Sequence, residues 1–248
     1  MNDWLAGLKA FGLGRNLQTG VRVPLAPLYF LKVIQVKAVV WDFDGVIVDS
    51  EPAVMQAFKT VLEKQGVHLT EKELFKSLGV KSIDFLEWLQ ESKGLKLDVE
   101  PIIQEKRALA LKLLEERLPV MDGSIELIQF FKEKGLRQAI ASNSNGKAIE
   151  DVLEKLGARD FFDVIVSSGD ASKGKPDPEP YLIALKKLNE SAGNCFAIED
   201  SPTGIEAAKG AGLTCFALKT RYFSEKELRK ADFIVGKLLE VKGVLGRL

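Results

Sequence analysis

The most constraining feature of this sequence is an apolar run that stops at two closely spaced aspartates. The run from Val36 to Trp41 is rich in β-branched residues, which is typical of a buried parallel strand. Asp42 and Asp44 come next, and Gly45 follows directly. Because side chains alternate along a strand, residues two apart project to the same side. Both carboxylates can therefore face the space beyond the strand's carboxyl end, where open α/β sheets bind ligands.

Two carboxylates this close together repel each other unless a cation or a proton lies between them. Mg²⁺ is a suitable cation, because it prefers oxygen ligands. The alternative is an ordinary strand end followed by a polar turn, since Asp-Gly pairs are common in turns. The aspartates therefore indicate a candidate magnesium site. The residues that follow the other predicted strands can distinguish this interpretation from an ordinary turn.

From Pro119 onward the sequence alternates between helix-like and strand-like segments. The strand-like segments are five short apolar runs: 137–141, 163–167, 195–198, 213–218 and 232–235. Alternation of this kind predicts a parallel sheet with helices on both of its faces. The predicted fold class is therefore α/β, with a doubly wound parallel sheet.

Between the first strand and this region, residues 53–118 show helical periodicity with no strand. Four consecutive helices at this place predict an inserted helical cap domain over 53–118. The α/β core domain would then consist of 36–52 and 119–248. Such a cap can exclude water from chemistry at the strand ends. Residues 1–35 contain one acidic residue among scattered glycines and prolines, and we expect them to form an N-terminal extension outside the fold.

The composition bears on the kind of partner and on the cellular location. Lys+Arg and Asp+Glu both number 35, so the net charge of zero gives no reason to expect a nucleic-acid partner. No apolar segment is long enough to span a bilayer, so we expect no membrane partner. Cys195 and Cys215 lie in apolar runs, as reduced thiols of cytoplasmic proteins commonly do. We expect a cytoplasmic protein that is a monomer or a weak dimer.

Polar residues also follow two of the other predicted strands. Ser142 and Asn143 precede a helix, where hydroxyl, amide and free backbone N–H groups can bind phosphate. Glu199 and Asp200 form a second pair of carboxylates, again just before a helix. Each pair alone has an ordinary explanation as a helix cap or an acidic helix N-terminus. Together with Lys175 in a glycine-containing loop, they predict a phosphate and metal site at one edge of the sheet.

These motifs resemble, in their order, the four motifs of the haloacid dehalogenase superfamily. The resemblance is to its β-phosphoglucomutase-like and phosphoglycolate-phosphatase-like branch, and it covers residues 36–235. The matching segments are Asp42 to Glu51, Ser142-Asn143, Lys175-Pro176-Asp177 and Glu199 to Gly204. The resemblance implies a Rossmann-like core and magnesium-dependent phosphoryl transfer through an aspartyl-phosphate.

The resemblance also implies a role for each residue. Asp42 would be the nucleophile, and Asp44 the acid that protonates the leaving oxygen and then the base that activates water. The phosphate would be bound by three side chains: Ser142, Asn143 and Lys175. The Mg²⁺ cofactor would be held by Asp42, the main-chain carbonyl of Asp44, Glu199 and Asp200. Whether Glu199 binds the metal directly or through water is open.

The choice between phosphatase and mutase depends on residues of the predicted cap. The phosphosugar mutases of the family carry a histidine at the position of Val54 and an arginine in the loop that reads Gly79-Val80-Lys81-Ser82 here. Both departures favour a phosphatase that hydrolyses a small phosphorylated metabolite, of the sugar phosphate or phosphoglycolate type. The alternatives are a β-phosphoglucomutase-like phosphosugar mutase and, more remotely, a non-catalytic phosphometabolite-binding protein.

Overall fold

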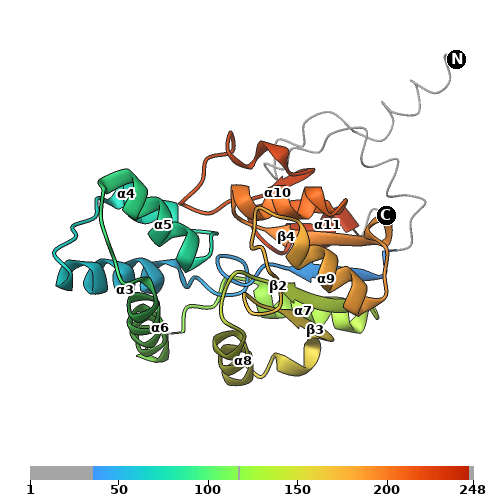
Figure 1. Ribbon diagram of the computed structural model, residues 1–248. Helices are drawn as coiled ribbons and strands as arrows, with labels where there is room; N and C mark the ends of the chain where they lie inside the picture. Colours follow the sequence, from blue (N-terminus) through green and yellow to red (C-terminus); the bar gives the residue numbers. More distant parts are fainter. Residues whose placement is uncertain (1–35, 117, 246–248) are drawn as a thin grey trace, which may run out of the picture.

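The computed structural model describes residues 36–116 and 118–245 of the 248-residue chain. Its centre is a six-stranded parallel sheet with the strand order β3-β2-β1-β4-β5-β6 (Figure 1). The α/β fold predicted from the sequence is confirmed. The expectation that residues 1–35 lie outside the fold concerns residues that are not described, and it stays a prediction.

All the predicted strands are present, with small shifts at their ends. They are β1 (Ala38–Trp41), β2 (Arg137–Ala141), β3 (Val164–Val166), β4 (Cys195–Glu199), β5 (Thr214–Leu218) and β6 (Phe233–Val235). Trp41 at the end of β1 lies opposite Ile140 of β2 and Ile198 of β4. The chain builds the sheet from β1 outward through β2 and β3, then returns to β4 on the other side. β1 is therefore the switch point at which α/β sheets bind ligands.

The helices of the core cover both faces of the sheet. They are α7 (Ser124–Glu133), α8 (Gly146–Lys155), α9 (Glu179–Leu188), α10 (Pro202–Gly210) and α11 (Glu240–Leu245). Four 3₁₀ segments are described: η1 (Phe75–Ser77), η2 (Arg159–Phe161), η3 (Ala192–Asn194) and η4 (Leu228–Lys230). The sequence-based prediction did not include α11. The sequence also predicts a helix near 225–230, and this is wrong, because the structure has only the single 3₁₀ turn η4 there.

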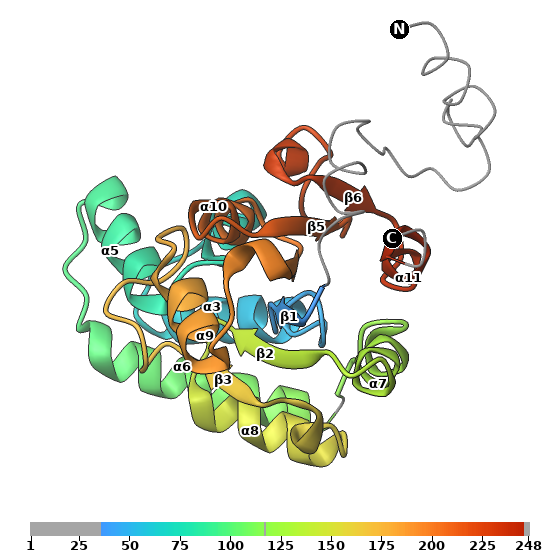
Figure 2. The ribbon, with the colours of Figure 1, turned by 90° about the vertical axis from the view of Figure 1, so that its right-hand side faces the viewer.

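The two faces of the sheet carry side chains of different size, because alternate strand residues point to opposite faces. One face buries large residues against α7, α8 and α11, among them Trp41, Ile140, Phe196, Phe216 and Phe233. The other face buries small residues against α9 and α10, among them Ala38, Ala139, Ala197, Cys215 and Ala217. Figure 2 shows α9 and α10 on one side of the sheet and α7 and α11 on the other. β1 is therefore buried on both faces, and the residues that follow it are anchored to the centre of the sheet.

Four helices lie in the sequence between β1 and β2, and we call them the helical insertion. They are α3 (Glu51–Lys64), α4 (Glu71–Leu74), α5 (Ser82–Lys93) and α6 (Val99–Glu116). They lie beside the sheet (Figure 1) and pack around an apolar cluster of their own, which includes Phe58, Leu62, Phe85 and Leu89. A capping box begins α4, with Glu73 N donating to Thr70 Oγ1 and Thr70 N to the Glu73 carboxylate. The division into a cap domain of 53–118 and a core domain stays a prediction.

In residues 36–116 and 118–245, no helix combines the length and the apolar character needed to cross a membrane. Cys195 and Cys215 are both free thiols in the interior. Burial raises the pKa of the Cys195 thiol to about 11 and raises that of Cys215 as well. Both thiols therefore stay protonated and belong to the apolar packing of the sheet.

Candidate active site

A pocket of about 370 Å³ lies between the helical insertion and the carboxyl ends of β1 and β2. All the site residues predicted from the sequence line this pocket except Glu199, which lies behind it with no exposed surface. The helical insertion contributes the opposite wall, including Val54, Lys81 and Lys106. The structure thus brings together side chains that are far apart in the sequence, at the switch point of the sheet.

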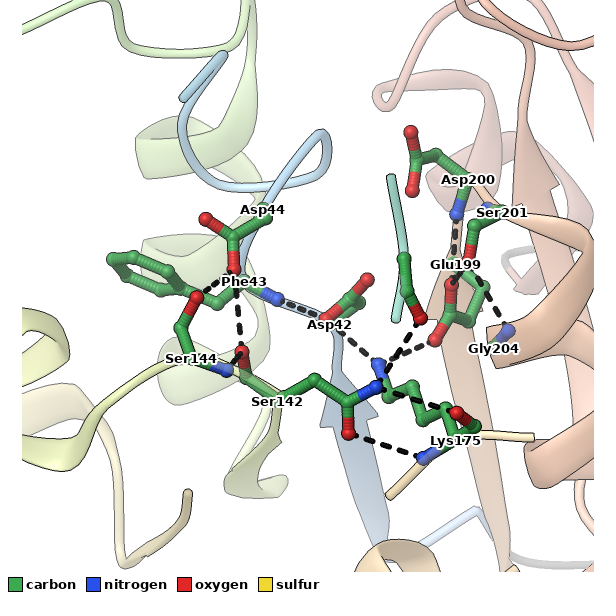
Figure 3. A network of polar contacts seen from close by, with 12 residues as sticks. Asp42, Phe43, Asp44, Ser142, Ser144, Lys175, Glu199, Asp200, Ser201 and Gly204 are labelled. Carbon is green, nitrogen blue, oxygen red and sulfur yellow. Dashed lines mark hydrogen bonds and ion pairs between the residues drawn. The ribbon is translucent and has the colours of Figure 1, made fainter. Parts of the chain in front are cut away.

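Asp42 and Lys175 form a buried ion pair at the floor of the pocket (Figure 3). Lys175 Nζ lies 2.7 Å from Asp42 Oδ1 and 2.6 Å from Glu199 Oε1, and the lysine side chain is only 2% exposed. Burial alone lowers the pKa of Lys175, but the two carboxylates raise it above its ordinary value, so the lysine stays charged. Asp42 Oδ1 also accepts a hydrogen bond from Phe43 N (2.7 Å). Among the described residues no donor contacts Asp42 Oδ2, which leaves this oxygen for chemistry.

The two carboxylates of the second pair differ in their hydrogen bonds. Both oxygens of Glu199 accept hydrogen bonds, whereas Asp200 has a buried oxygen that accepts none. Glu199 Oε1 accepts from Lys175 and from Tyr181 Oη, each at 2.6 Å, and Oε2 accepts from Asp200 N (3.1 Å) and Ser201 Oγ (3.3 Å). Asp200 Oδ2, in contrast, is buried without a hydrogen-bond partner. Figure 3 shows Asp200 on the side of Glu199 away from Lys175. Asp200 is therefore better suited than Glu199 to bind a metal directly.

The residues of this cluster fit a divalent cation. Asp42, Glu199 and Asp200 each offer a carboxylate oxygen, and the three oxygens lie within 4.8 Å of one another. Burial, together with the charge of neighbouring carboxylates, raises the pKa of Asp42 and of Asp200 well above the usual range. Lys175 is the one described cation paired with the cluster, so negative charge is in excess. A hard cation with oxygen ligands, such as Mg²⁺, supplies the charge that this set lacks.

Glu51 is a member of this environment that sequence reasoning missed. It begins α3, is only 5% exposed, and its Oε2 is buried without a hydrogen-bond partner. Burial first, and then the charge of Asp44, raises the pKa of its carboxyl. Its charge is also the largest Coulombic contribution at Asp200. In the sequence, Glu51 has the ordinary explanation of an acid in the first turn of a helix.

We expect Mg²⁺ to stabilise the folded protein, and to do so more at pH 7.5 than at pH 5.0. Because the carboxyls of Asp42, Glu51 and Asp200 have raised pKa values, the metal-free folded chain binds protons more tightly than the unfolded chain. These three carboxyls therefore lower the free energy of unfolding of the metal-free protein, and so its stability, as pH rises above about 4. Bound Mg²⁺ offsets this loss. Mg²⁺ at about 100 times its Kd should raise Tm by roughly 5–10 °C at pH 7.5, measured by differential scanning calorimetry.

Asp200→Asn should lose most of this Mg²⁺-dependent shift, whereas the exposed Asp122→Asn should keep it. NaCl at the same ionic strength separates specific binding from screening of surface charge. An equal rise in Tm with NaCl, or a shift that Asp200→Asn leaves intact, would contradict a metal site at this cluster.

The Asp44 side chain points away from Asp200 and toward three hydroxyl groups. Asp44 Oδ2 accepts from Ser144 Oγ at 2.6 Å and Ser142 Oγ at 3.3 Å, and Oδ1 accepts a short hydrogen bond from Ser50 Oγ. Figure 3 shows Asp42 between the serines Ser142 and Ser144 on one side and Lys175 on the other. The two aspartates that the sequence places side by side thus lie in different surroundings. Ser50 and Ser144 were not predicted as site residues, because serines beside a helix start are common as caps.

Asn143, predicted to bind phosphate, joins the core to the helical insertion in this structure. Its Oδ1 accepts from Lys175 N (3.0 Å), and its Nδ2 donates to the carbonyl of Gly79 (3.2 Å). Thr203 Oγ1 donates to the same carbonyl (2.9 Å). Gly79 has φ +71°, and a Cβ atom there would collide with Thr203 and Ser201, so only glycine fits this junction. The phosphate-binding role of Asn143 stays a prediction.

Comparison with known proteins identifies the class to which this fold and site belong. A family model described as "haloacid dehalogenase-like hydrolase" matches residues 36–212, and the chain belongs to this family. The phosphorylated carbohydrates phosphatase of Thermotoga maritima is 34% identical over 181 residues, which is 71% of this chain and 82% of that protein. The sequence-based prediction of a haloacid dehalogenase-type phosphoric monoester hydrolase is confirmed at this level of class.

Solved structures agree with the fold. The crystal structure of CbbY from Rhodobacter sphaeroides in complex with phosphate is 26% identical, with a TM-score of 0.78 over 85% of this chain and 99% of that chain. A β-phosphoglucomutase from Clostridium difficile is 24% identical, with a TM-score of 0.74 over 86% of this chain and 98% of that chain. At that identity the second likeness supports the fold alone. The choice between phosphatase and mutase has to come from the residues of this chain.

Proposed function

We propose that this protein is a Mg²⁺-dependent phosphatase that hydrolyses a small phosphomonoester, of the sugar phosphate or phosphoglycolate type, through an aspartyl-phosphate on Asp42. The observation that carries the proposal is the position of Asp42. It lines the pocket at the switch point of the sheet, with one oxygen bound by Lys175 and Phe43 N and the other contacted by no donor among the described residues. A fixed carboxylate with one available oxygen is suited to attack an electrophile bound in that pocket.

In the first step, Asp42 Oδ2 forms a bond to phosphorus while the bond from phosphorus to the leaving oxygen breaks. The electron pair goes to the leaving oxygen, which takes a proton from Asp44. In the second step, a water oxygen attacks the phosphorus of the aspartyl-phosphate and gives its proton to the Asp44 carboxylate. The bond from phosphorus to Asp42 breaks, and orthophosphate and free Asp42 are released.

Other residues of the site hold the phosphoryl group and its charge. Ser142, which is only 1% exposed, and Lys175 lie on the pocket floor and can donate to phosphoryl oxygens. Asp42, the Asp44 main-chain carbonyl and Asp200 would hold Mg²⁺, and Glu199 would position Lys175 and contact the metal through water. Bound Mg²⁺ neutralises phosphoryl oxygens as negative charge develops on them.

Two features of the helical insertion favour hydrolysis over mutase activity. Val54, an apolar residue without a proton to exchange, lines the pocket where the family's mutases carry a histidine. Lys81 is the one cation of its loop, but its Nζ donates to the core carbonyls of Ala171 (3.1 Å) and Ser172 (3.4 Å). Its charge therefore joins the insertion to the core, and it is poorly placed to substitute for the mutase arginine.

We expect the enzyme to release inorganic phosphate from any ester that it accepts. The decisive experiment incubates it with β-glucose 1-phosphate and a glucose bisphosphate primer and follows the products by ³¹P NMR. A mutase has to protect its aspartyl-phosphate from water until a second sugar is bound. At the positions of the mutase histidine and loop arginine, this chain has Val54 and the sequence Gly79-Val80-Lys81-Ser82. Efficient conversion to glucose 6-phosphate with little free phosphate would contradict the proposed phosphatase activity and support mutase activity instead.

A panel of phosphorylated metabolites, assayed for phosphate release with Mg²⁺ and with EDTA, tests the activity more broadly. We expect release that depends on Mg²⁺ and a preference for one chemical group of esters. A non-catalytic binding protein would release no phosphate from any ester while still binding some of them. The cytoplasmic location and the monomeric or weakly dimeric state stay predictions.

A further inference from the structure

The helical insertion places a lysine in the pocket that the proposed mechanism does not use. Lys106, on α6, lines the pocket opposite the predicted phosphate-binding residues and is half-buried. Its Nζ donates to Ser82 Oγ at 3.1 Å and lies 4.6 Å from the centre of the Phe58 ring. These contacts hold the lysine in place, but a neutral hydroxyl and a ring face do not neutralise its charge.

The neighbours of Lys106 increase the local positive charge. Arg107 follows it on α6 and also lines the pocket. Among the described residues, neither of the two side chains has an ion-pair partner. Glu100 is the acid of α6 that lines the pocket, but it is exposed and accepts a hydrogen bond from Gln104 Nε2. The insertion wall therefore presents two adjacent cations to the pocket.

Burial, with the charge of Arg107 acting in the same direction, lowers the pKa of Lys106 to about 8, although Asp44 across the pocket opposes the shift. In the free protein these surroundings destabilise the charged form of the lysine, and an anion bound beside it would stabilise that form. The other lysines of the pocket are directed elsewhere, since Lys175 pairs with buried carboxylates and Lys81 Nζ donates to carbonyls of the core.

We propose that Lys106 and Arg107 form a second anion subsite, and that the substrate is a phosphomonoester carrying a second anionic group, a carboxylate or a further phosphate. One end of such a molecule binds at Asp42, and the other end reaches the insertion wall. This inference rests on the proposed phosphatase function and narrows its substrate class.

The test uses phosphonates, whose phosphorus–carbon bond has no leaving oxygen for this mechanism. Binding of phosphonoacetate, 3-phosphonopropionate and 4-phosphonobutyrate is compared, by calorimetry with Mg²⁺ present, with binding of the alkylphosphonates that lack the carboxylate. We expect at least one carboxylated member to bind about 10- to 100-fold more tightly than the alkylphosphonate that lacks its carboxylate. 1,3-Propylenediphosphonate tells whether a second phosphate-like group is preferred to a carboxylate.

Substitutions show whether Lys106 carries this preference. Lys106→Met should remove it and leave the affinity for propylphosphonate within about threefold, whereas Lys106→Arg should retain most of it. Lys112→Met is the matched control, because Lys112 is exposed on the same helix and does not line the pocket. Lys106→Gln, which can still donate to Ser82 Oγ, serves as a second variant if the methionine variant does not fold.

The outcomes separate the subsite from the function on which it rests. Equal binding of carboxylated and plain phosphonates by the wild type, or an equal loss of both in Lys106→Met, would overturn the subsite. Absence of Mg²⁺-dependent phosphate release from every ester would instead overturn the phosphatase. The preference for the second anion should also decline as pH rises through about 8, because Lys106 then loses its charge.

Discussion

Asp42→Asn should lose essentially all turnover while the protein stays folded. The amide is a poor nucleophile and a weaker metal ligand, so no aspartyl-phosphate forms. We expect kcat to fall by more than about a thousandfold, a loss of transition-state stabilisation of about 4 kcal/mol. The measurement is the steady-state release of phosphate from the best ester of the metabolite panel, at saturating substrate and Mg²⁺.

The fold should tolerate this change, because an asparagine oxygen can still accept from Phe43 N and from Lys175. One negative charge also leaves a cluster in which burial and the charge of Glu199 raise the pKa of Asp42. The Tm of the metal-free variant should therefore equal or exceed that of the wild type. Asp122→Asn, at an exposed position outside the pocket, is the matched control and should keep full activity. Activity above about a tenth of wild type in Asp42→Asn would show that another group is the nucleophile.

The position of the site was predictable because it follows from local patterns. An apolar run with β-branched residues predicts the central strand, and period-two alternation places Asp42 and Asp44 beyond its end. Parallel strands bring their carboxyl ends to one edge, so the residues after β1, β2 and β4 had to meet there. Ser142 and Asp200 were found by this reasoning without knowledge of any distance.

Contacts that depend on packing between distant segments could not be predicted in this way. The hydroxyl of Ser144 reaches Asp44 across 100 residues, and Tyr181 on α9 reaches Glu199 at the end of β4. Nothing in the local sequence distinguishes these side chains from a helix cap and a core aromatic residue. Lys106 is the same kind of case, because its half-buried position depends on how α6 packs against Phe58. Short elements were also hard to predict, and α11 has only six residues, one of them Gly243.

Asp42 and Asp44 have different hydrogen-bond and ion-pair partners. This difference explains how one residue can attack phosphorus while its neighbour transfers protons. Asp42 contacts the cation Lys175, which opposes the rise in its pKa caused by burial and by Glu199 and so favours the ionised form that a nucleophile needs. Among the described residues, the carboxylate of Asp44 accepts hydrogen bonds from hydroxyl groups alone, and its Oδ2 accepts from both Ser142 and Ser144. Hydroxyl groups can rotate to donate or to accept, so they can accommodate Asp44 in its protonated and ionised forms alike. A general acid that later acts as a base requires this tolerance.

Asp44→Asn should therefore keep the metal site and lose proton transfer. Any role of Asp44 in metal binding uses its main-chain carbonyl, which the substitution leaves in place, so Mg²⁺ affinity measured by calorimetry should change little. The asparagine cannot protonate the leaving oxygen or deprotonate water, so kcat/KM for an alkyl phosphate should fall by about 10²- to 10⁴-fold. One of the two hydroxyls of Ser50 and Ser144 can still donate to the amide oxygen, and the other can accept from the amide nitrogen, so the fold should be retained.

The leaving group decides whether this loss reflects acid catalysis. A nitrophenolate leaves without protonation, whereas an alkoxide does not, so formation of the aspartyl-phosphate from nitrophenyl phosphate should be much less impaired than its formation from an alkyl phosphate. Rapid-quench measurement of the first turnover isolates this step from the later attack by water, for which Asp44 serves as the base. Ser144→Ala is a useful companion, because it removes a hydroxyl contact of Asp44 and keeps the carboxylate. If Asp44→Asn slows the first turnover equally for both esters, Asp44 does not act as the acid, and its carboxylate serves only to organise the serines around it.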